Sequence, residues 1–387
     1  MKIQQIIRHE VNYMFHQNPK VVRMLFLIPL LYTLLFGFAY STNVVKQIPT
    51  VIYDQDHTPA SFALLQAFAD SERYKIVAQV STQEEMEQYL YEDKALVALA
   101  IPPKFSQDIK LGNSSQVMVT INTPNLMFSN SILGTFPEII QTVSAGMGQK
   151  SLEGLNQMPS QALATTAPIR LALRVLNNPT LAYNNFMLPG LEANGLQLAI
   201  MLSICYIFTR EYAGIDLWKE TSGPLITLGK LLPYWIFSII SFMLSIWAAI
   251  QVFSVPFRGD IGSLLLIGSA FTFAIANVGA FFSVIAPNEV ASVQLPMLYI
   301  MPAFLFSNYS WPTLAMNEFS QLFSAILPLT YAADTIRDIL LAGYAPSLIT
   351  NAAILFAFGS LLFLVTSCIF SLRRKRLLHA SKKEVLL

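Results

Sequence analysis

The chain has 387 residues, of which 54% are hydrophobic and only 12% are charged. The charged fraction is about half that of an average soluble domain, which favours a membrane protein. The formal net charge of +1 argues against a nucleic-acid-binding protein, which would carry a strongly basic surface. Cys205 and Cys368 both lie in apolar runs, which predicts two packing residues rather than a disulfide framework.

The N-terminal segment, residues 1–19, predicts an amphipathic helix. Ile3, Ile7, Val11 and Met14 recur at helical spacing, and Pro19 ends the pattern. Such a helix lies in the membrane interface and leads into the first span. Two functions stay open for it: a plain interfacial anchor, or an elbow that contacts other cytoplasmic segments.

Apolar runs predict an α-helical membrane protein with six transmembrane helices, the first over residues 20–41 and the others within 184–371. A spanning helix needs about 20 apolar residues. Five uncharged runs qualify, namely 24–45, 231–257, 261–288, 290–317 and 339–372. A sixth run, 193–209, reaches spanning length only if it extends back to Phe186 with Glu192 near the interface. Because a charge at the bilayer centre is costly, we expect all charged residues outside the span centres.

Lysine and arginine residues in the short flanking segments predict the orientation. One side carries Lys2, Arg8, Lys20, Arg23, Arg210, Lys219, Lys230, Arg373, Arg374, Lys375, Arg376, Lys382 and Lys383. The other side carries only Arg258 and Arg337. The positive-inside rule therefore predicts that both termini, including the basic tail 372–387, are cytoplasmic. A cleaved signal peptide over the first run is disfavoured, because the polar region before Met24 is too long.

Residues 42–183 form too long and too polar a segment for a loop, and they predict a folded domain outside the cell interior. Apolar, β-branched runs at 50–53, 74–80, 95–101 and 117–121 predict strands. Thr58-Pro59 predicts one helix start, and Ser81 with Glu84 predicts a capping box that opens another helix. The alternation indicates a small inserted α/β domain. From residue 125 to about 178 the pattern is mostly helical.

An acidic pair in this domain, Asp54 and Asp56, has two possible roles, as metal ligands or as turn residues. Asp54 and Asp56 stand in a turn sequence beside His57, with no further ligand-type residue close by. Aspartates in such a position commonly accept hydrogen bonds from the turn backbone. We therefore expect turn and capping residues rather than metal ligands, and no catalytic constellation.

Three stretches resemble the ABC type-2 permease family, in the branch with a large extracytoplasmic domain between the first two spans. They are VIYDQDHTPAS with ALVALAIPPKFSQDIKLG, then TREYAGIDLWKETSGPLITLGKLLPY, and finally FLFSNYSWPTLAMNEFSQLFSAILPLTYAADTIRDILLAG. The resemblance covers nearly the whole chain. The middle stretch departs from it, since IDLWKETSG stands where relatives have a longer Leu-rich helix and a Thr-Pro pair.

The resemblance implies two functional segments. A cytoplasmic coupling loop at 209–227 would contact a separate ATPase, and its candidate residues are Arg210, Glu211, Gly214, Lys219 and Glu220. A re-entrant segment at 308–343 would dip into the outer leaflet before the last span, with Arg337 and Asp338 at the outer interface. The alternative for the first segment is a positively flanked loop with no partner.

The function implied is that of the permease subunit of an ATP-driven ABC exporter in a bacterial inner membrane. ATP and Mg would be held by the partner ATPase, because GPLITLGKL has Leu231 where a phosphate-binding loop needs Ser or Thr. A second permease chain, identical or related, would complete the path, and a periplasmic membrane-fusion adaptor would join it where an outer membrane exists. Neither a cofactor of its own nor nucleic acid is expected.

Small and polar residues in the predicted spans are candidates for the substrate path, although close helix packing explains them equally well. They are Asn194, Gln197, Ser203, Asn277 and Ser283. The lack of a carboxylate or lysine predicted inside the spans disfavours a proton- or sodium-driven transporter. The remaining alternative is a non-transporting membrane anchor or receptor, which would need fewer spans.

Overall fold

The computed structural model describes residues 3–42, 44–111, 113–123, 125–153, 176–213 and 221–384. The chain forms two compact units. The first unit joins Met1–Asn43 to Val175–Leu387 and is helical; the second, Val44–Arg174, contains a β-sheet and falls within the segment 42–183. Each unit is described separately.

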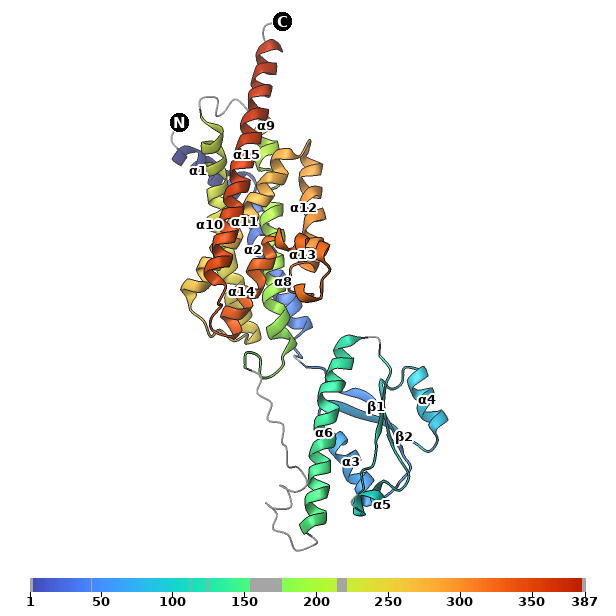
Figure 1. Cartoon of the computed structure of the whole chain (residues 1–387). Coiled ribbons are helices and arrows are strands. Elements are labelled where there is room, and N and C mark those ends of the chain that lie inside the picture. The colour runs from blue at the N-terminus through green and yellow to red at the C-terminus, as the bar shows by residue number, and fades with distance from the viewer. Residues whose placement is uncertain are drawn as a thin grey trace. The chain divides into compact units, whose positions relative to one another are not determined.

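The helical unit is a bundle of long apolar helices that run side by side (Figure 1). They are α2 (Lys20–Ala39), α8 (Tyr183–Ile204), α10 (Gly223–Phe253), α11 (Ile261–Ile285) and α15 (Leu348–Glu384). Shorter helices are α1 (Ile3–Asn12), α9 (Ile207–Ala213), α12 (Glu289–Leu305), α13 (Glu318–Ala325) and α14 (Pro328–Leu341). A π-helical turn, Tyr13–Gln17, links α1 towards α2, and a 3₁₀ turn, Thr313–Ala315, precedes α13.

Five of the described helices, rather than the six predicted, are long and apolar enough to cross a bilayer. The run 290–317 does not continue as one helix. It forms α12, whose 17 residues include Pro296 and Pro302, and the chain then turns at Asn308, which has a φ of 65°. Because an α-helix rises about 1.5 Å per residue, α12 is shorter than the hydrocarbon core.

Glu192 lies in the middle of a long helix, and the prediction that charges avoid the span centres is therefore wrong for this residue. α8 begins at Tyr183, so the expected extension of the sixth run back to Phe186 is confirmed, but Glu192 occupies the middle of the helix instead of its end. α10 begins at Gly223, inside the predicted coupling loop, so Lys230 is part of the first third of that helix. Both side chains are buried, at 1% exposure each. The argument against ion-coupled transport that relied on their absence no longer holds.

Small and hydroxyl-bearing residues bring these helices together. Gly195 on α8 lies against the ring of Tyr32 on α2, where any larger residue would collide. The Ser241 hydroxyl on α10 donates to the carbonyl of Leu25 on α2 at 2.7 Å. Trp235 Nε1, also on α10, donates to the carbonyl of Ser269 on α11 at 2.9 Å. Close backbone approach and interhelical hydrogen bonds of this kind are how helices associate where lipid surrounds them.

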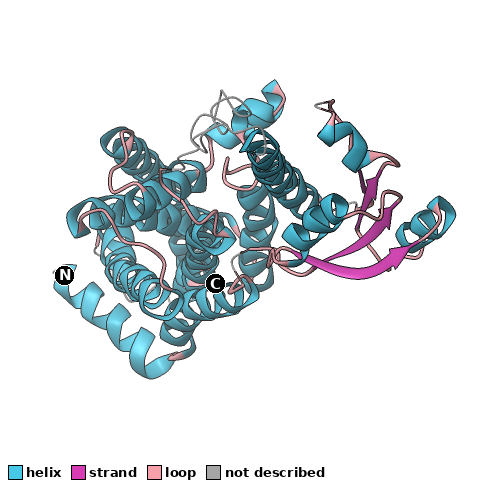
Figure 2. Cartoon of the chain, turned by 90° about the horizontal axis from the view of Figure 1, so that it is seen from below, coloured by secondary structure: helices cyan, strands magenta, loops and turns pink. Residues whose placement is uncertain are grey.

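The second unit has a four-stranded sheet in the order β2-β1-β3-β4. β1 (Ile48–Asp54) pairs in parallel with β2 (Tyr74–Val80) and β3 (Val97–Ile101), while β4 (Met118–Ile121) is antiparallel to β3. The helices are α3 (Pro59–Ala69), α4 (Gln83–Tyr91), α5 (Phe105–Lys110) and α6 (Leu126–Glu153). Figure 2 shows the strands in magenta. Each of the four predicted strands overlaps an observed strand.

Separate apolar clusters cover the two faces of this sheet. On one face Phe68 of α3, Tyr74 of β2 and Phe136 of α6 pack ring against ring, with centroids 4.3 to 5.4 Å apart. On the other face Met86 and Leu90 of α4 pack on Val51 and Ala98. The sheet is therefore buried on both sides, as expected for parallel strands joined by helices.

Helix starts in this unit agree with the sequence in one case and differ in the other. Thr58 caps α3, and its hydroxyl accepts from the Ser61 amide as the Thr-Pro signal predicts. For α4 the cap is Thr82, not Ser81, because the Thr82 hydroxyl reaches the Glu85 amide at 3.2 Å. The Glu85 carboxylate in turn accepts from the Ser81 amide. α6 is a continuous helix that includes Gly134, Gly146 and Gly148.

Candidate functional site

Helix α1 presents a face with a carboxylate in its centre to the bundle. The fully buried residues are Ile6, Glu10 and Met14, at positions i, i+4 and i+8. The predicted face of Ile3, Ile7 and Val11 is only partly buried, because the helix turns towards α10. Ile6 packs on Gly229, where an added Cβ would lie 2.9 Å from its side chain. This close contact fixes α1 against α10.

Glu10 and three further charged side chains form a cluster, here called the ion cluster, of Glu10, Arg210, Glu211 and Lys230. Arg210 donates to both Glu10 carboxylate oxygens, at 2.7 and 2.8 Å. Lys230 Nζ lies 3.1 Å from Glu10 and 2.7 Å from Glu211. Two positive and two negative charges therefore balance within contact distance.

Two aromatic residues complete the ion cluster. The hydroxyl of Tyr234, on α10, donates to Glu10 Oε1 at 3.1 Å. The Arg210 guanidinium lies over the ring of Tyr13, 3.4 Å from its centroid. Fully buried charges are stable only when they are paired and their hydrogen bonds are satisfied, and Glu10 meets both conditions.

The charges also set the protonation state of Glu10. Burial alone would raise the pKa of this carboxyl group, but Lys230 and Arg210 beside it outweigh burial and hold the pKa below its usual value of 4.5. Glu10 is therefore ionised at neutral pH, and the free energy of its ion pairs is lost only as the pH falls below this value. The ion cluster joins three elements, α1, α9 and α10, at one end of the bundle.

Of the predicted coupling residues, the structure places Arg210 and Glu211 in the ion cluster. Gly214, Lys219 and Glu220 lie outside the described residues. Sequence reasoning missed Glu10 and Tyr234 altogether, and treated Lys230 only as a flanking charge. The spacing Ile6-Glu10-Met14 was a usable signal, since it places a carboxylate on an otherwise apolar helix face.

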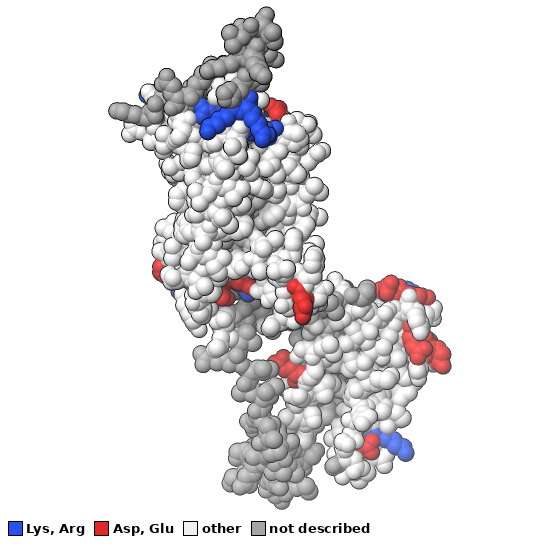
Figure 3. All heavy atoms as spheres, turned by 45° about the horizontal axis from the view of Figure 1, so that its top comes forward, with Lys and Arg blue, Asp and Glu red and all other residues white. Residues whose placement is uncertain are grey.

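The basic tail contributes to the same end of the unit. Arg373, on α15, donates to the carbonyls of Val284 and Ala286 at 2.9 and 3.0 Å, at the end of α11. Cations at a helix C-terminus satisfy the last carbonyls and the helix dipole. Figure 3 shows Lys and Arg gathered at this end of the helical unit. The tail therefore also fastens α15 to α11.

The predicted path residues are all buried within the bundle. Ser203 donates to the carbonyl of Val21 at 3.3 Å, and Ser283 accepts from the amide of Phe208 at 3.1 Å, so both connect helices. The Nδ2 of Asn277 donates to Phe273 in its own helix. Asn194 and Gln197 on α8 leave polar side-chain atoms without a hydrogen-bond partner.

At the opposite end of the bundle the predicted re-entrant segment holds a second polar cluster. Arg337 on α14 pairs with Asp334 at 2.8 Å and lies over the rings of Phe186 and Tyr309, at 5.2 and 5.1 Å from their centroids. Asn308 donates to Asp334, and Tyr309 donates to the carbonyl of Phe186. These contacts connect the turn after α12 to α14 and to the start of α8.

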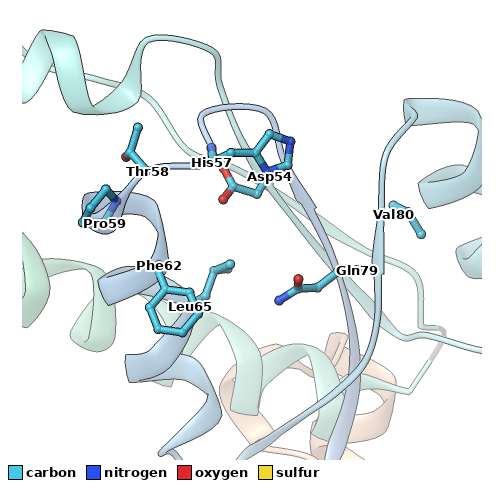
Figure 4. A pocket seen from close by; sticks show the side chains of 8 residues that line it. All are labelled: Asp54, His57, Thr58, Pro59, Phe62, Leu65, Gln79 and Val80. Atoms are coloured by element: carbon cyan, nitrogen blue, oxygen red, sulfur yellow. Dashed lines mark hydrogen bonds between the residues drawn. The ribbon is translucent and has the colours of Figure 1, made fainter.

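The α/β unit has a cavity of about 480 Å³ beyond the carboxyl ends of β1 and β2. Figure 4 shows Asp54 and His57 on one side of Phe62 and Leu65, with Gln79 across the opening. Asp54 accepts from the amides of Asp56 and His57 and from the Ser61 hydroxyl. Asp56 accepts from the Thr58 hydroxyl and the Ser106 amide. Both aspartates are therefore occupied in turn and helix-start contacts, as their sequence predicts.

The fold and these clusters define a multi-pass helical membrane protein whose N-terminal helix is ion-paired to the bundle. Residues 20–367 match the profile described as ABC-2 family transporter protein. The chain belongs to the ABC-2 transporter family, and the predicted resemblance is confirmed at that level.

The chain is also similar in sequence to individual proteins. The chain is 23% identical over 351 residues to the probable multidrug ABC transporter permease YbhR of Escherichia coli K12, covering 90% of this chain and 92% of the relative. It is 21% identical over 347 residues to YbhS, a probable multidrug ABC transporter permease of the same strain, covering 85% and 86%. ABC transporter G family member 20 of Dictyostelium discoideum is 25% identical over 262 residues, which are 61% of this chain and 35% of that protein.

Proposed function

We propose that this chain is the permease subunit of an ATP-driven ABC exporter, which moves its substrate outward with a separate ATPase subunit. The observation that carries the proposal is the ion cluster, in which the elbow helix α1, the start of the coupling loop on α9 and the spanning helix α10 share buried charges. A push on α9 from an ATPase would move α1 and α10 together, because separating them exposes unpaired charges. The names of YbhR and YbhS support the same function.

The assembly we propose has two permease chains, identical or related, and two ATPase subunits that hold ATP and Mg. In a cell with an outer membrane, a membrane-fusion adaptor binds the α/β unit on the periplasmic side. The proposed topology has six spans, with the short helix α12 as the fifth, and both termini cytoplasmic. A non-transporting anchor is the weaker alternative, because an anchor gains nothing from a buried charge cluster that joins three helices.

The coupling assignment predicts a loss of function without a loss of the protein. In Glu211→Ala, Lys230 keeps its contact with Glu10, so the bundle should still fold and insert. Loss of a buried ion-pair partner should lower its stability, and activity is therefore compared per amount of folded complex. Substrate-stimulated ATPase activity of the complex purified with its ATPase should nevertheless fall by about tenfold, since a coupling free energy of 1 to 3 kcal/mol is typical. Glu289→Ala, the same change at an exposed acidic residue, should leave this activity unchanged.

Purification under mild detergent provides the first check of that experiment, because the ATPase subunit should be recovered with the chain. An activity in Glu211→Ala equal to that of the native complex would reject the coupling assignment. Repeated recovery of the chain without any ATPase would reject the proposed function itself.

Thiol labelling tests the orientation. In a Cys205→Ser, Cys368→Ser background, a cysteine at the exposed Tyr91 should react with a membrane-impermeant maleimide added to intact spheroplasts. A cysteine at Gln17, which is also exposed, should react only after the membrane is permeabilised. The reverse pattern would place the α/β unit in the cytoplasm and contradict the proposed topology.

A further inference from the structure

Glu192 is a carboxyl group in the middle of α8 that the ion cluster does not use. Its side chain is 1% exposed, and neither carboxylate oxygen has a hydrogen-bond partner. The polar group beside it is Ser245 on α10. The Ser245 hydroxyl is directed instead to the carbonyls of Ser241 and Phe242, at 3.1 and 3.0 Å. In the described parts of the chain, no lysine or arginine pairs with Glu192.

The surroundings of Glu192 differ from those of the buried charged groups in the ion cluster. Glu10 has two cations and a hydroxyl, Lys230 has two carboxylates, and Glu211 has Lys230. A carboxylate that is desolvated without a partner is strongly unfavourable, so residues of this kind in membrane helices are found where a cation, proton or ligand can meet them. A structural glutamate would have the partners that the ion cluster supplies.

We propose that Glu192 binds the positively charged group of the transported molecule within the membrane. The inference rests on the proposed transport function and adds the substrate class, lipophilic organic cations. A cation supplies the partner that the carboxylate lacks. The same site gives a neutral molecule of similar shape no electrostatic advantage.

Equilibrium dialysis tests the proposal on the purified full-length chain in phosphatidylcholine nanodiscs, without any ATPase. The probes are tetraphenylphosphonium and the neutral triphenylphosphine oxide, each corrected for empty nanodiscs. Glu192→Gln should weaken tetraphenylphosphonium binding by at least about tenfold, since a lost buried charge pair is commonly worth more than one factor of ten. Binding of the neutral probe should not change. Glu289→Gln, the same change at an exposed acidic residue, should bind both probes as the native chain does.

The proposal is overturned if Glu192→Gln binds the cation as tightly as the native chain, or if the native chain binds no cation. Equal weakening for both probes would also overturn it, because that indicates a general packing defect. Since no ATPase is present, the outcome is independent of the proposed function. Failure of ATP-driven transport with intact cation binding would reject the exporter and leave the cation site standing.

Discussion

Replacing Glu10 with glutamine is expected to destabilise the purified protein by about 3 to 5 kcal/mol, the usual cost of removing one partner from a buried charge cluster. The substitution keeps the shape of the side chain but removes its charge. Lys230, at 1% exposure, would then pair with Glu211 alone, and Arg210 would lose the carboxylate to which it donates. Thermal unfolding of the purified protein in detergent measures the loss of stability. Limited proteolysis measures how readily the α1 helix detaches from the bundle.

The control for this prediction is the double variant Glu10→Gln with Arg210→Met. It also removes the cation that loses its carboxylate in Glu10→Gln, and it keeps the pair of Lys230 with Glu211. It should therefore be more stable than Glu10→Gln alone, by an interaction energy of about 1 to 3 kcal/mol. A single variant within about 0.5 kcal/mol of the native protein would match an ordinary surface substitution and contradict the buried cluster.

Replacing Tyr309 with alanine is expected to cost about 3 to 5 kcal/mol, as for other large aromatic side chains removed from a packed interior. The ring is 2% exposed and stacks on Phe186, with centroids 5.7 Å apart, while Arg337 lies over it. Its removal leaves a void against Gly190 and loosens the turn after α12. The change in thermal unfolding temperature of the purified chain measures the loss.

Tyr309→Phe separates the ring from its hydroxyl. This variant keeps the stack on Phe186 and the contact with Arg337, and loses only the hydrogen bond to the Phe186 carbonyl. It should cost about 1 kcal/mol, the typical net value of one such bond. Equal losses in the two variants would mean that the hydroxyl, and not the ring, holds the turn.

Much of the architecture was predictable because it depends on local patterns. The long uncharged runs become α2, α10, α11 and α15, since lipid demands a continuous apolar helix whatever its neighbours are. The strands at 50–53 and 74–80 are found because β-branched runs between turn residues are recognisable in isolation. The sixth run was expected to extend back to Phe186, close to the start of α8 at Tyr183, but Glu192 was wrongly placed at the interface, because its burial by neighbouring helices is not visible in the sequence.

The candidate sites were only half predictable, because they are built from residues far apart in the sequence. Arg210 and Glu211 could be named from their motif. Glu10, which accepts hydrogen bonds from Arg210, lies 200 positions earlier in the chain and could not. The orphan state of Glu192 depends on where the Ser245 hydroxyl points, which no sequence pattern encodes. Tertiary packing alone decides whether a carboxylate in a helix is paired or left alone.

The separation between Glu10 and its partners also orders the biogenesis of the protein. Glu10 leaves the ribosome some 200 residues ahead of Arg210 and 220 ahead of Lys230, with the whole α/β unit synthesised in between. Until both cations arrive, the carboxylate is stable only in contact with water. The first helix to be made is thus among the last to dock, and its docking marks completion of α10.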